Sequence, residues 1–304
     1  MAPFMYGRHF VGMRDSLVSA LAWTFKVAFR KAAGEKLYQQ CRVTMLHQEH
    51  GLGLDWGWYN SLRTVRPIRR DFGWQAGQTI DRYYAEEVFL PQHSGDIRGR
   101  VLEIGDRRYT ERFGGAKVTQ SDVLNVKPGN NQTTIIADLT SAAHIPSNTF
   151  DCAILTFTLQ FVYDVRAALR TLYRILKPGG VLLIAVPGIS QIARYDDDNW
   201  GEYWRFTSRS ARMLFEEVFQ PDSLTIRTHG NVLAAIASLH GLISNELQRD
   251  ELNHHDRDYE LLITIRAMKE HRACLPGSSE HPCAITSGSG PVRDAVRGIS
   301  EQSA

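Results

Sequence analysis

The chain has 304 residues, of which 43% are hydrophobic and 22% are charged, the composition of a globular protein with a sizeable core. Its 35 Lys and Arg against 33 Asp and Glu give a net charge of +2, without the basic excess typical of nucleic-acid-binding proteins. The four cysteines lack metal-ligand spacing, and no apolar run approaches the roughly 20 residues that span a bilayer. Composition therefore argues against disulfide scaffolds, zinc modules, transmembrane proteins and nucleic-acid partners, and we expect a cytoplasmic protein.

Residues 1–70 are predicted to form a helical N-terminal extension. Apolar residues recur at spacings of three and four between Phe10 and Phe25, which indicates an amphipathic helix over about residues 10–33. Several Arg and Lys residues make this helix basic. Two interpretations follow: the helix packs on the main domain or on a partner in a homodimer, which we favour, or it lies on an anionic membrane surface as a peripheral contact.

Residues 71–270 alternate short apolar runs with helical patterns, and the runs at 100–105, 117–122, 134–138, 150–156 and 181–186 are predicted strands. A helix predicted from Val165 ends where Pro178 and two glycines follow. Strands that alternate with helices indicate an α/β fold, a three-layer sandwich with a mainly parallel, doubly wound, Rossmann-like sheet. Residues 271–304 are rich in Gly, Ser and Pro and are predicted to be a disordered tail.

Acidic residues occur in or directly after the first three predicted strands: Glu103, Asp122 and Asp138. In an open parallel sheet, ligands bind beyond the carboxyl ends of the strands. Asp122 follows Gly105 by 17 residues, close to the roughly 20 residues that separate a nucleotide-binding turn from the carboxylate that binds the ribose. The sequence therefore predicts a nucleoside-binding site at this edge.

Residues 101–105 resemble the first motif of the class I, Rossmann-like methyltransferases that use S-adenosylmethionine, in their small-molecule, type 11-like branch. Residues 138–151 and 176–184 resemble later motifs of the same class, and residues 204–207 with the helix after them resemble its next element. The resemblance covers about residues 97–225. It implies S-adenosylmethionine as cofactor, with Asp122 on the ribose and Asp138 facing the adenine.

The resemblance implies a larger set of cofactor contacts in this chain. The set comprises Arg82, Glu103, Gly105, Asp106, Asp122, Val123, Asp138, Leu139, Thr156 and Phe157. Arg82 belongs to a segment that covers the cofactor in related enzymes, and its planar guanidinium suits the methionine carboxylate. The chain departs from the class in having only one glycine, Gly105, where two or three are usual. The side chains that follow it exclude a dinucleotide dehydrogenase, whose pyrophosphate needs bare backbone.

The segment 195–204 contains carboxylates and aromatic rings where substrate enters in this class. Tyr195 and Asp196 are candidate catalytic residues there, and His229 is a third candidate base. Carboxylates and aromatic faces suit a sugar; the alternative is a solvated acidic loop beside a local aromatic core. Three consecutive aspartates have the hard oxygen ligands of a divalent cation, but such runs are more often solvated, so we assign no metal.

Two functions remain open on the sequence. The first is methyl transfer from S-adenosylmethionine to a small-molecule or carbohydrate acceptor, with an oxygen as the expected nucleophile. The second is a catalytically degenerate methyltransferase fold that serves as a binding or scaffold subunit, which the crowded loop at 106–109 favours. The three acids together oppose the second. Binding of the cofactor separates the two functions.

Overall fold

A computed structural model describes residues 64–271; the helix expected at 10–33 and the tail expected from 272 onward lie outside these residues. A compact unit begins at Asp71, and the following description concerns that unit. None of the helices within residues 64–271 is long and apolar enough to cross a membrane.

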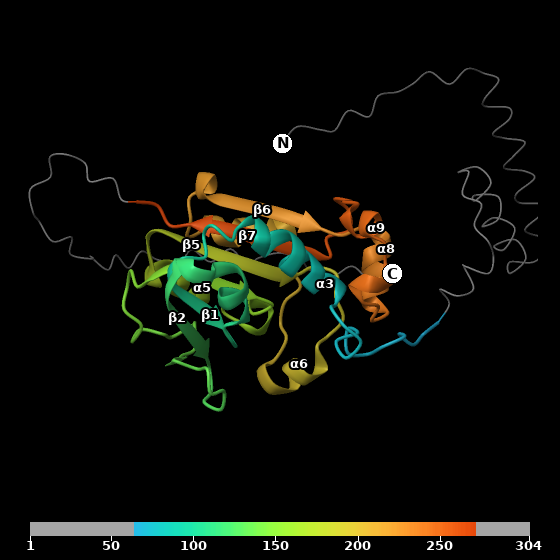
Figure 1. Cartoon of the computed structure of the whole chain (residues 1–304), viewed down its shortest axis with the longest axis horizontal. Helices are drawn as coiled ribbons and strands as arrows, with labels where there is room; N and C mark the ends of the chain where they lie inside the picture. Colours follow the sequence, from blue (N-terminus) through green and yellow to red (C-terminus); the bar gives the residue numbers. More distant parts are fainter. Residues whose placement is uncertain (1–63, 272–304) are drawn as a thin grey trace, which may run out of the picture. The chain divides into compact units, whose positions relative to one another are not determined.

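Seven strands form one sheet in the order β3-β2-β1-β4-β5-β7-β6 (Figure 1). The strands are β1 Gly99–Ile104, β2 Val118–Asn125, β3 Ile135–Ile136, β4 Phe150–Thr156, β5 Leu176–Pro187, β6 Leu224–His229 and β7 Leu262–Met268. The first five are mutually parallel, and β7 is antiparallel to both β5 and β6. The expected doubly wound, mainly parallel α/β sheet is confirmed.

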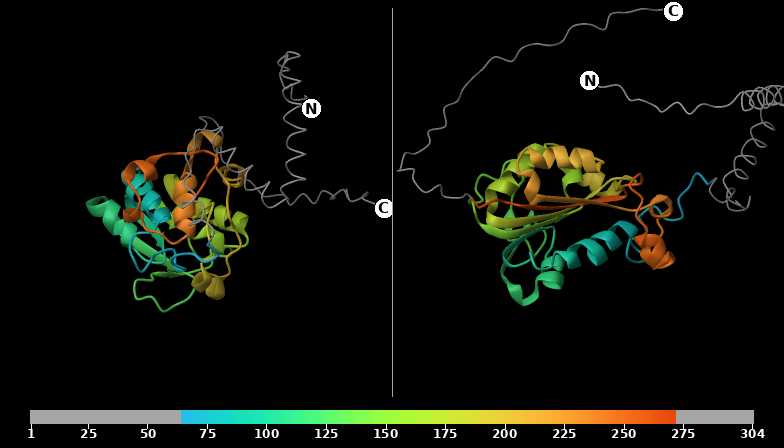
Figure 2. Two further views of the ribbon diagram at one scale, coloured as in Figure 1. Left: turned by 90° about the vertical axis from the view of Figure 1, so that its right-hand side faces the viewer. Right: turned by 90° about the horizontal axis from the view of Figure 1, so that it is seen from above.

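Helices cover both faces of the sheet (Figure 2). One face carries α5 Val165–Ile175 and α7 Ser208–Glu216, and the other carries the continuous helix of α3 Ile80–Tyr83, η1 Tyr84–Phe89 and α4 Leu90–Gln92, together with α8 Val232–Leu239. The remaining elements are η2 Thr110–Gly114, η3 Gly115–Lys117, η4 Leu159–Phe161, α6 Arg194–Trp200, η5 Pro221–Ser223, η6 Ser244–Glu246 and α9 Arg249–Asn253. The three layers agree with the sequence-based expectation.

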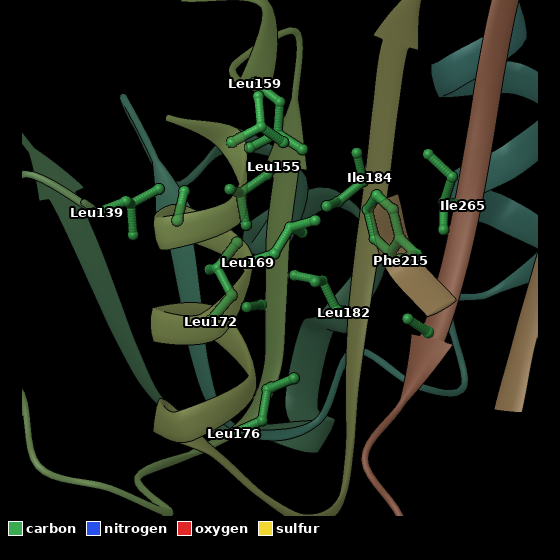
Figure 3. Packing of buried hydrophobic residues seen from close by; sticks show 14 of the residues in the cluster. Leu139, Leu155, Leu159, Leu169, Leu172, Leu176, Leu182, Ile184, Phe215 and Ile265 are labelled. Atoms are coloured by element: carbon green, nitrogen blue, oxygen red, sulfur yellow. The ribbon is translucent and has the colours of Figure 1, made fainter. Parts of the chain in front are cut away.

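The helix α5 shows why this sequence builds that core. Its Leu169 and Leu172 lie on one face and are fully buried against Leu182 and Ile184 of β5 (Figure 3). Burial of each such side chain contributes roughly 1.5–3 kcal/mol. Asp164 caps the helix by accepting a hydrogen bond from the Ala167 amide at 2.9 Å.

The helix before β1 is irregular. Its middle, Tyr84–Phe89, is a π-helix between two short α-helical turns. Both Tyr84 and Phe89 are buried, and the Tyr84 hydroxyl donates to the Leu252 carbonyl at 2.8 Å. Single π turns are frequent at functional sites, and this one begins two residues after Arg82.

The strand β2 extends three residues beyond its predicted end. It continues through the buried Val123 and Leu124 and ends at Asn125. Asp122 lies opposite Leu102 in the middle of the sheet, not at its edge. Its carboxylate accepts hydrogen bonds from Arg100 Nε at 2.7 Å and from the Thr134 hydroxyl at 3.1 Å. The prediction that Asp122 ends its strand is therefore wrong, because these partners let a carboxylate be buried within the sheet.

Candidate functional site

The order of the strands reverses between β1 and β4: β1 leads to β2 on one side, and β4 leads to β5 on the other. Ligands of open α/β sheets bind at such a switch point, beyond the carboxyl ends of the strands. Glu103 pairs with Val123 on one side and Ile154 on the other, so the three strands end at nearly the same level. The residues that follow β1, β2 and β4 therefore surround one place.

Gly105 follows β1 at this switch point. Its φ of +91° is a backbone conformation that favours glycine, and a Cβ built on it would meet no atom within 4 Å. Asn125 and Asn130 donate to its carbonyl from their Nδ2 atoms, at 3.2 and 2.6 Å. The backbone is thus held in place with open space beside it, which fits the close approach of a ligand.

Glu103 holds the loop from beneath. Its carboxylate is buried and accepts hydrogen bonds from the backbone amides of Tyr109 and Thr110 and from the Thr110 hydroxyl, at 2.7–3.0 Å. Burial raises the pKa of Glu103 to about 7, although these donors work in the opposite direction. With its oxygens bonded to these donors, Glu103 fixes the loop that follows β1.

Asp106 has its carboxylate oxygens bound by a neighbour. Arg108 donates to them from Nε and Nη2 at 2.7–3.1 Å, and its backbone amide adds a bond of 3.0 Å. Burial alone would raise the pKa of Asp106, but the bonds from Arg108 outweigh it and lower the pKa. The predicted contact with the cofactor therefore has to come from the backbone of this residue or compete with Arg108.

Asn125 occupies the position expected of Asp122. It ends β2 beside Gly105, whose amide donates to the Leu124 carbonyl at 3.2 Å. Its Nδ2 donates to Gly105 and to the Thr133 hydroxyl, and its Oδ1 has no donor within residues 64–271. Val123, also predicted as a contact, has a fully buried side chain within the strand. Asn125 follows Gly105 by 20 residues and Asp122 follows it by 17, so the expected spacing of a ribose-binding residue also fits Asn125.

Asp138 lies two residues beyond the end of β3 and is exposed. Its Oδ1 accepts hydrogen bonds from the amide and the hydroxyl of Thr140, both at 2.8 Å. Its Oδ2 has no partner in the described part of the chain. The side chain of Leu139 is buried in the core beneath α5, so this residue offers a ligand only its backbone.

Thr156 and Phe157 lie at the end of β4, where the backbone turns sharply. Phe157 has a φ of +51°, an unfavourable conformation for an aromatic residue, and its amide donates to the Ala185 carbonyl at 2.8 Å. In the next turn, Gln160 is buried and its Oε1 has no hydrogen-bond partner among residues 64–271. Strain and an unpaired buried amide both occur at this strand end, the place where a ligand is expected.

Arg82 connects these segments. Its Nη1 donates to Glu86 at 3.2 Å and to the Tyr109 hydroxyl at 2.8 Å. Its guanidinium carbon lies 4.5 Å from the centre of the Trp74 ring and 5.7 Å from that of Phe157. Nε and Nη2 have no acceptor among the described residues. A guanidinium fixed by two rings and one tyrosine thus presents a free edge, the fork that a carboxylate binds.

Asp196 lies on α6, which follows β5. Burial raises its pKa, Glu202 raises it further, and Arg82 opposes the shift. Arg82 also lowers the pKa of Asp106, so its charge influences both carboxylates. Tyr195, the preceding residue, is 80% exposed, and no described residue contacts its hydroxyl. The charge of Arg82 thus influences the carboxyl of Asp196, whereas Tyr195 lies on the surface.

His229 does not belong to this group. It ends β6, two strands beyond β5, where its ring stacks on Tyr84 and its Nε2 is 2.9 Å from the Thr264 hydroxyl. Burial lowers the pKa of His229 to about 4, and the charges of His255 and Arg227 act in the same direction. A buried imidazole of this pKa is a poor base at neutral pH, so the structure argues for a packing role.

Trp74 and Tyr109 complete the site, although the sequence does not single them out as contacts. They hold Arg82 through a ring face and a hydroxyl, and they come from opposite sides of β1 in the chain.

Residues 64–271 contain no group of three or more His, Cys, Asp or Glu side chains that could hold a metal ion. Asp196, Asp197 and Asp198 therefore do not converge on one point.

Comparisons with known proteins agree with this geometry. Residues 107–184 match a family described as the methyltransferase domain. The chain is 32% identical over 121 residues to the ubiquinone/menaquinone biosynthesis C-methyltransferase UbiE of Enterobacter sp. (strain 638), covering 33% of this chain and 48% of that protein. The protein of the same name from Escherichia coli O1:K1 is 30% identical over 131 residues, with the same coverage. The chain thus spans about half the length of these curated relatives.

Among solved structures, a SAM-dependent methyltransferase from Archaeoglobus fulgidus matches with a TM-score of 0.42 and 15% identity, covering 62% of this chain and 92% of that one. The strand order, the switch point and the family match define a Rossmann-like methyltransferase fold. Over the matched residues 107–184 the chain is thus similar to the class I methyltransferases, which use S-adenosylmethionine as their cofactor.

Proposed function

We propose that this domain transfers a methyl group from S-adenosylmethionine to an oxygen of a small-molecule or carbohydrate acceptor in the cytoplasm. The observation that carries the proposal is the position of Arg82 beside Tyr109 and Phe157, which follow β1 and β4 at the switch point, with the free edge of its guanidinium available to a ligand. Bound S-adenosylmethionine supplies a sulfonium methyl that is already activated, so the protein must chiefly position the two reactants.

The residues at the strand ends fit the parts of this cofactor. Beside Gly105 the backbone is open to the methionine moiety, and the Arg82 fork suits its carboxylate. The free Oδ1 of Asn125 can accept a hydrogen bond from a ribose hydroxyl, and the free Oδ2 of Asp138 can accept one from the adenine amino group. Each of these atoms is supported by a second contact that fixes its side chain or backbone.

Asp196 is the proposed general base. A carboxylate with a raised pKa is closer to the pH at which it works, and this one titrates within the influence of Arg82. It would take the proton of the acceptor hydroxyl as the oxygen attacks the methyl group. The relatives named C-methyltransferases make a carbon acceptor the alternative, and the same carboxylate would then remove a proton from carbon.

Calorimetric titration of the full chain with S-adenosylhomocysteine tests the cofactor site. Wild type should bind in the micromolar range, and Arg82→Gln should weaken binding by about tenfold or more, because charge-assisted hydrogen bonds to the carboxylate are lost. Arg212→Gln removes a surface arginine paired with Glu216 on α7 and serves as the matched control. Absence of binding by folded wild-type protein would favour the scaffold function instead.

A further inference from the structure

Three aromatic side chains form an exposed surface next to the proposed site. Tyr163, Tyr203 and Trp204, here called the aromatic platform, are 72%, 51% and 39% exposed. The ring centres of Tyr163 and Tyr203 are 5.3 Å apart, and those of Tyr163 and Trp204 are 6.1 Å apart. Clustered exposed rings of this kind mark a binding surface more often than isolated ones do.

The platform is rigidly built from two segments far apart in the sequence. The Gln160 carbonyl accepts hydrogen bonds from the backbone amides of Tyr203 and Trp204, at 2.8 and 3.4 Å. Trp204 Nε1 donates to the Val162 carbonyl at 3.0 Å. Fixing the rings in advance removes part of the entropy cost of binding, so their exposed faces are prepared for a ligand.

The platform and the proposed site are both built on segments that follow the carboxyl ends of the parallel strands. Tyr163 follows β4 and η4, and the other two rings follow β5 and α6, so all three are attached beyond the carboxyl ends of neighbouring parallel strands. Asp196, the proposed base, lies on the same excursion from β5 as Tyr203 and Trp204.

The charges and the ring geometry select the kind of ligand. Residues 194–205 contain four acids and two arginines, a net charge of −2, which disfavours phosphorylated acceptors and anionic lipid surfaces. A flat aromatic molecule fits between two parallel rings only if they are about 7 Å apart, twice the contact distance of carbon atoms. The ring centres of Tyr163 and Trp204 are closer than this, so no aromatic ligand fits between them. What remains is a set of open ring faces with the hydroxyls of Tyr163 and Tyr203 unbonded within the described residues.

We propose that the aromatic platform binds a neutral glycan, stacking the C–H faces of its sugar rings and directing one hydroxyl toward Asp196. This inference rests on the proposed methyl transfer and names its acceptor class. Sugars combine apolar faces with hydroxyl groups at the ring edge, which matches exposed aromatic rings bordered by carboxylates.

The test follows binding of cellotetraose, chitotetraose and mannotetraose to the full chain by tryptophan fluorescence and calorimetry, with and without S-adenosylhomocysteine. Saturable binding of at least one oligosaccharide is expected, and Trp204→Ala and Tyr163→Ala should each weaken it by about tenfold, the loss of one aromatic stacking contact. Trp204→Phe, which keeps a stacking face, should retain most of the affinity. Tyr259→Ala, at an exposed tyrosine elsewhere, should bind like wild type.

All four variants should bind S-adenosylhomocysteine as wild type does. Loss of S-adenosylhomocysteine binding would therefore indicate a failure of the cofactor site, and loss of oligosaccharide binding alone would indicate a failure of the platform. The inference is overturned if no oligosaccharide saturates, or if Trp204→Ala binds glycan as tightly as wild type. Sedimentation with phosphatidylglycerol vesicles that depends on Trp204 would overturn it in favour of a membrane surface.

Discussion

The positions of Asp122 and Asn125 yield the sharpest prediction. We expect Asp122 to stabilise the sheet and Asn125 to bind the ribose, although an aspartate is the residue that the sequence suggests for the ribose. In Asp122→Asn the bond to Arg100 loses its charge, and the pair is mostly buried on the aspartate side. A hydrogen bond between charged groups contributes about 1.5–3 kcal/mol, and Arg100 can partly recover by reaching water, so we expect a loss near 2 kcal/mol. For a domain of roughly 200 residues this lowers Tm by about 4–8 °C.

The same substitution should leave the affinity for S-adenosylhomocysteine unchanged, since Asp122 lies in mid-sheet opposite Leu102. Asn125→Ala should do the reverse. It removes the free Oδ1 and one of the two donors that hold the Gly105 carbonyl, and should weaken binding by about tenfold, with a smaller loss of stability. Calorimetry and thermal melting of the two variants measure both quantities. If Asp122→Asn lost affinity and Asn125→Ala did not, the register described here would be refuted.

Three further predictions concern titratable groups. Because burial raises the pKa of Glu103 to about 7 from 4.5, its contribution to stability is complete below pH 4.5 and is lost as pH rises through 7; urea denaturation across this range should show a decline of up to about 3 kcal/mol that is absent in Glu103→Gln. Asp196→Asn should lower kcat by about a hundredfold or more while the affinity for S-adenosylhomocysteine is kept, whereas Asp198→Asn on the same helix should behave like wild type, and equal rates in both would remove Asp196 as the base. His229→Gln should cost about 1 kcal/mol of stability through its contacts with Thr264 and Tyr84 and leave turnover intact, so a folded but inactive variant would restore His229 as a candidate base.

The sequence predicts the fold well because its signals are local and repeated. Strands β1, β4 and β5 each contain a short run of buried apolar residues, and α5 carries a clear apolar face between an aspartate cap and a Pro-Gly stop. The register of β2 was not predictable from acid positions alone. An aspartate after an apolar run predicts the end of a strand. Here Arg100, 22 residues away in the sequence, donates a hydrogen bond to Asp122 and so stabilises its carboxylate inside the sheet.

The candidate site was predicted in part for a similar reason. Gly105, Asp138 and Arg82 are recognisable from their places relative to the strands. The arrangement around Arg82 was not, because Trp74 and Tyr109 meet it only through the tertiary fold, and the strained backbone of Phe157 leaves no mark in the sequence. His229 attracted attention as a histidine, whereas burial decides its chemistry.

A crystal structure of the full chain with S-adenosylhomocysteine bound tests the central claim most directly. We expect the ligand at the β1/β4 switch point, with its carboxylate on Arg82, a ribose hydroxyl on Asn125 and the adenine amino group near Asp138. A ligand whose ribose displaced Arg100 to reach Asp122, or one bound away from Gly105, would contradict the site described for this domain.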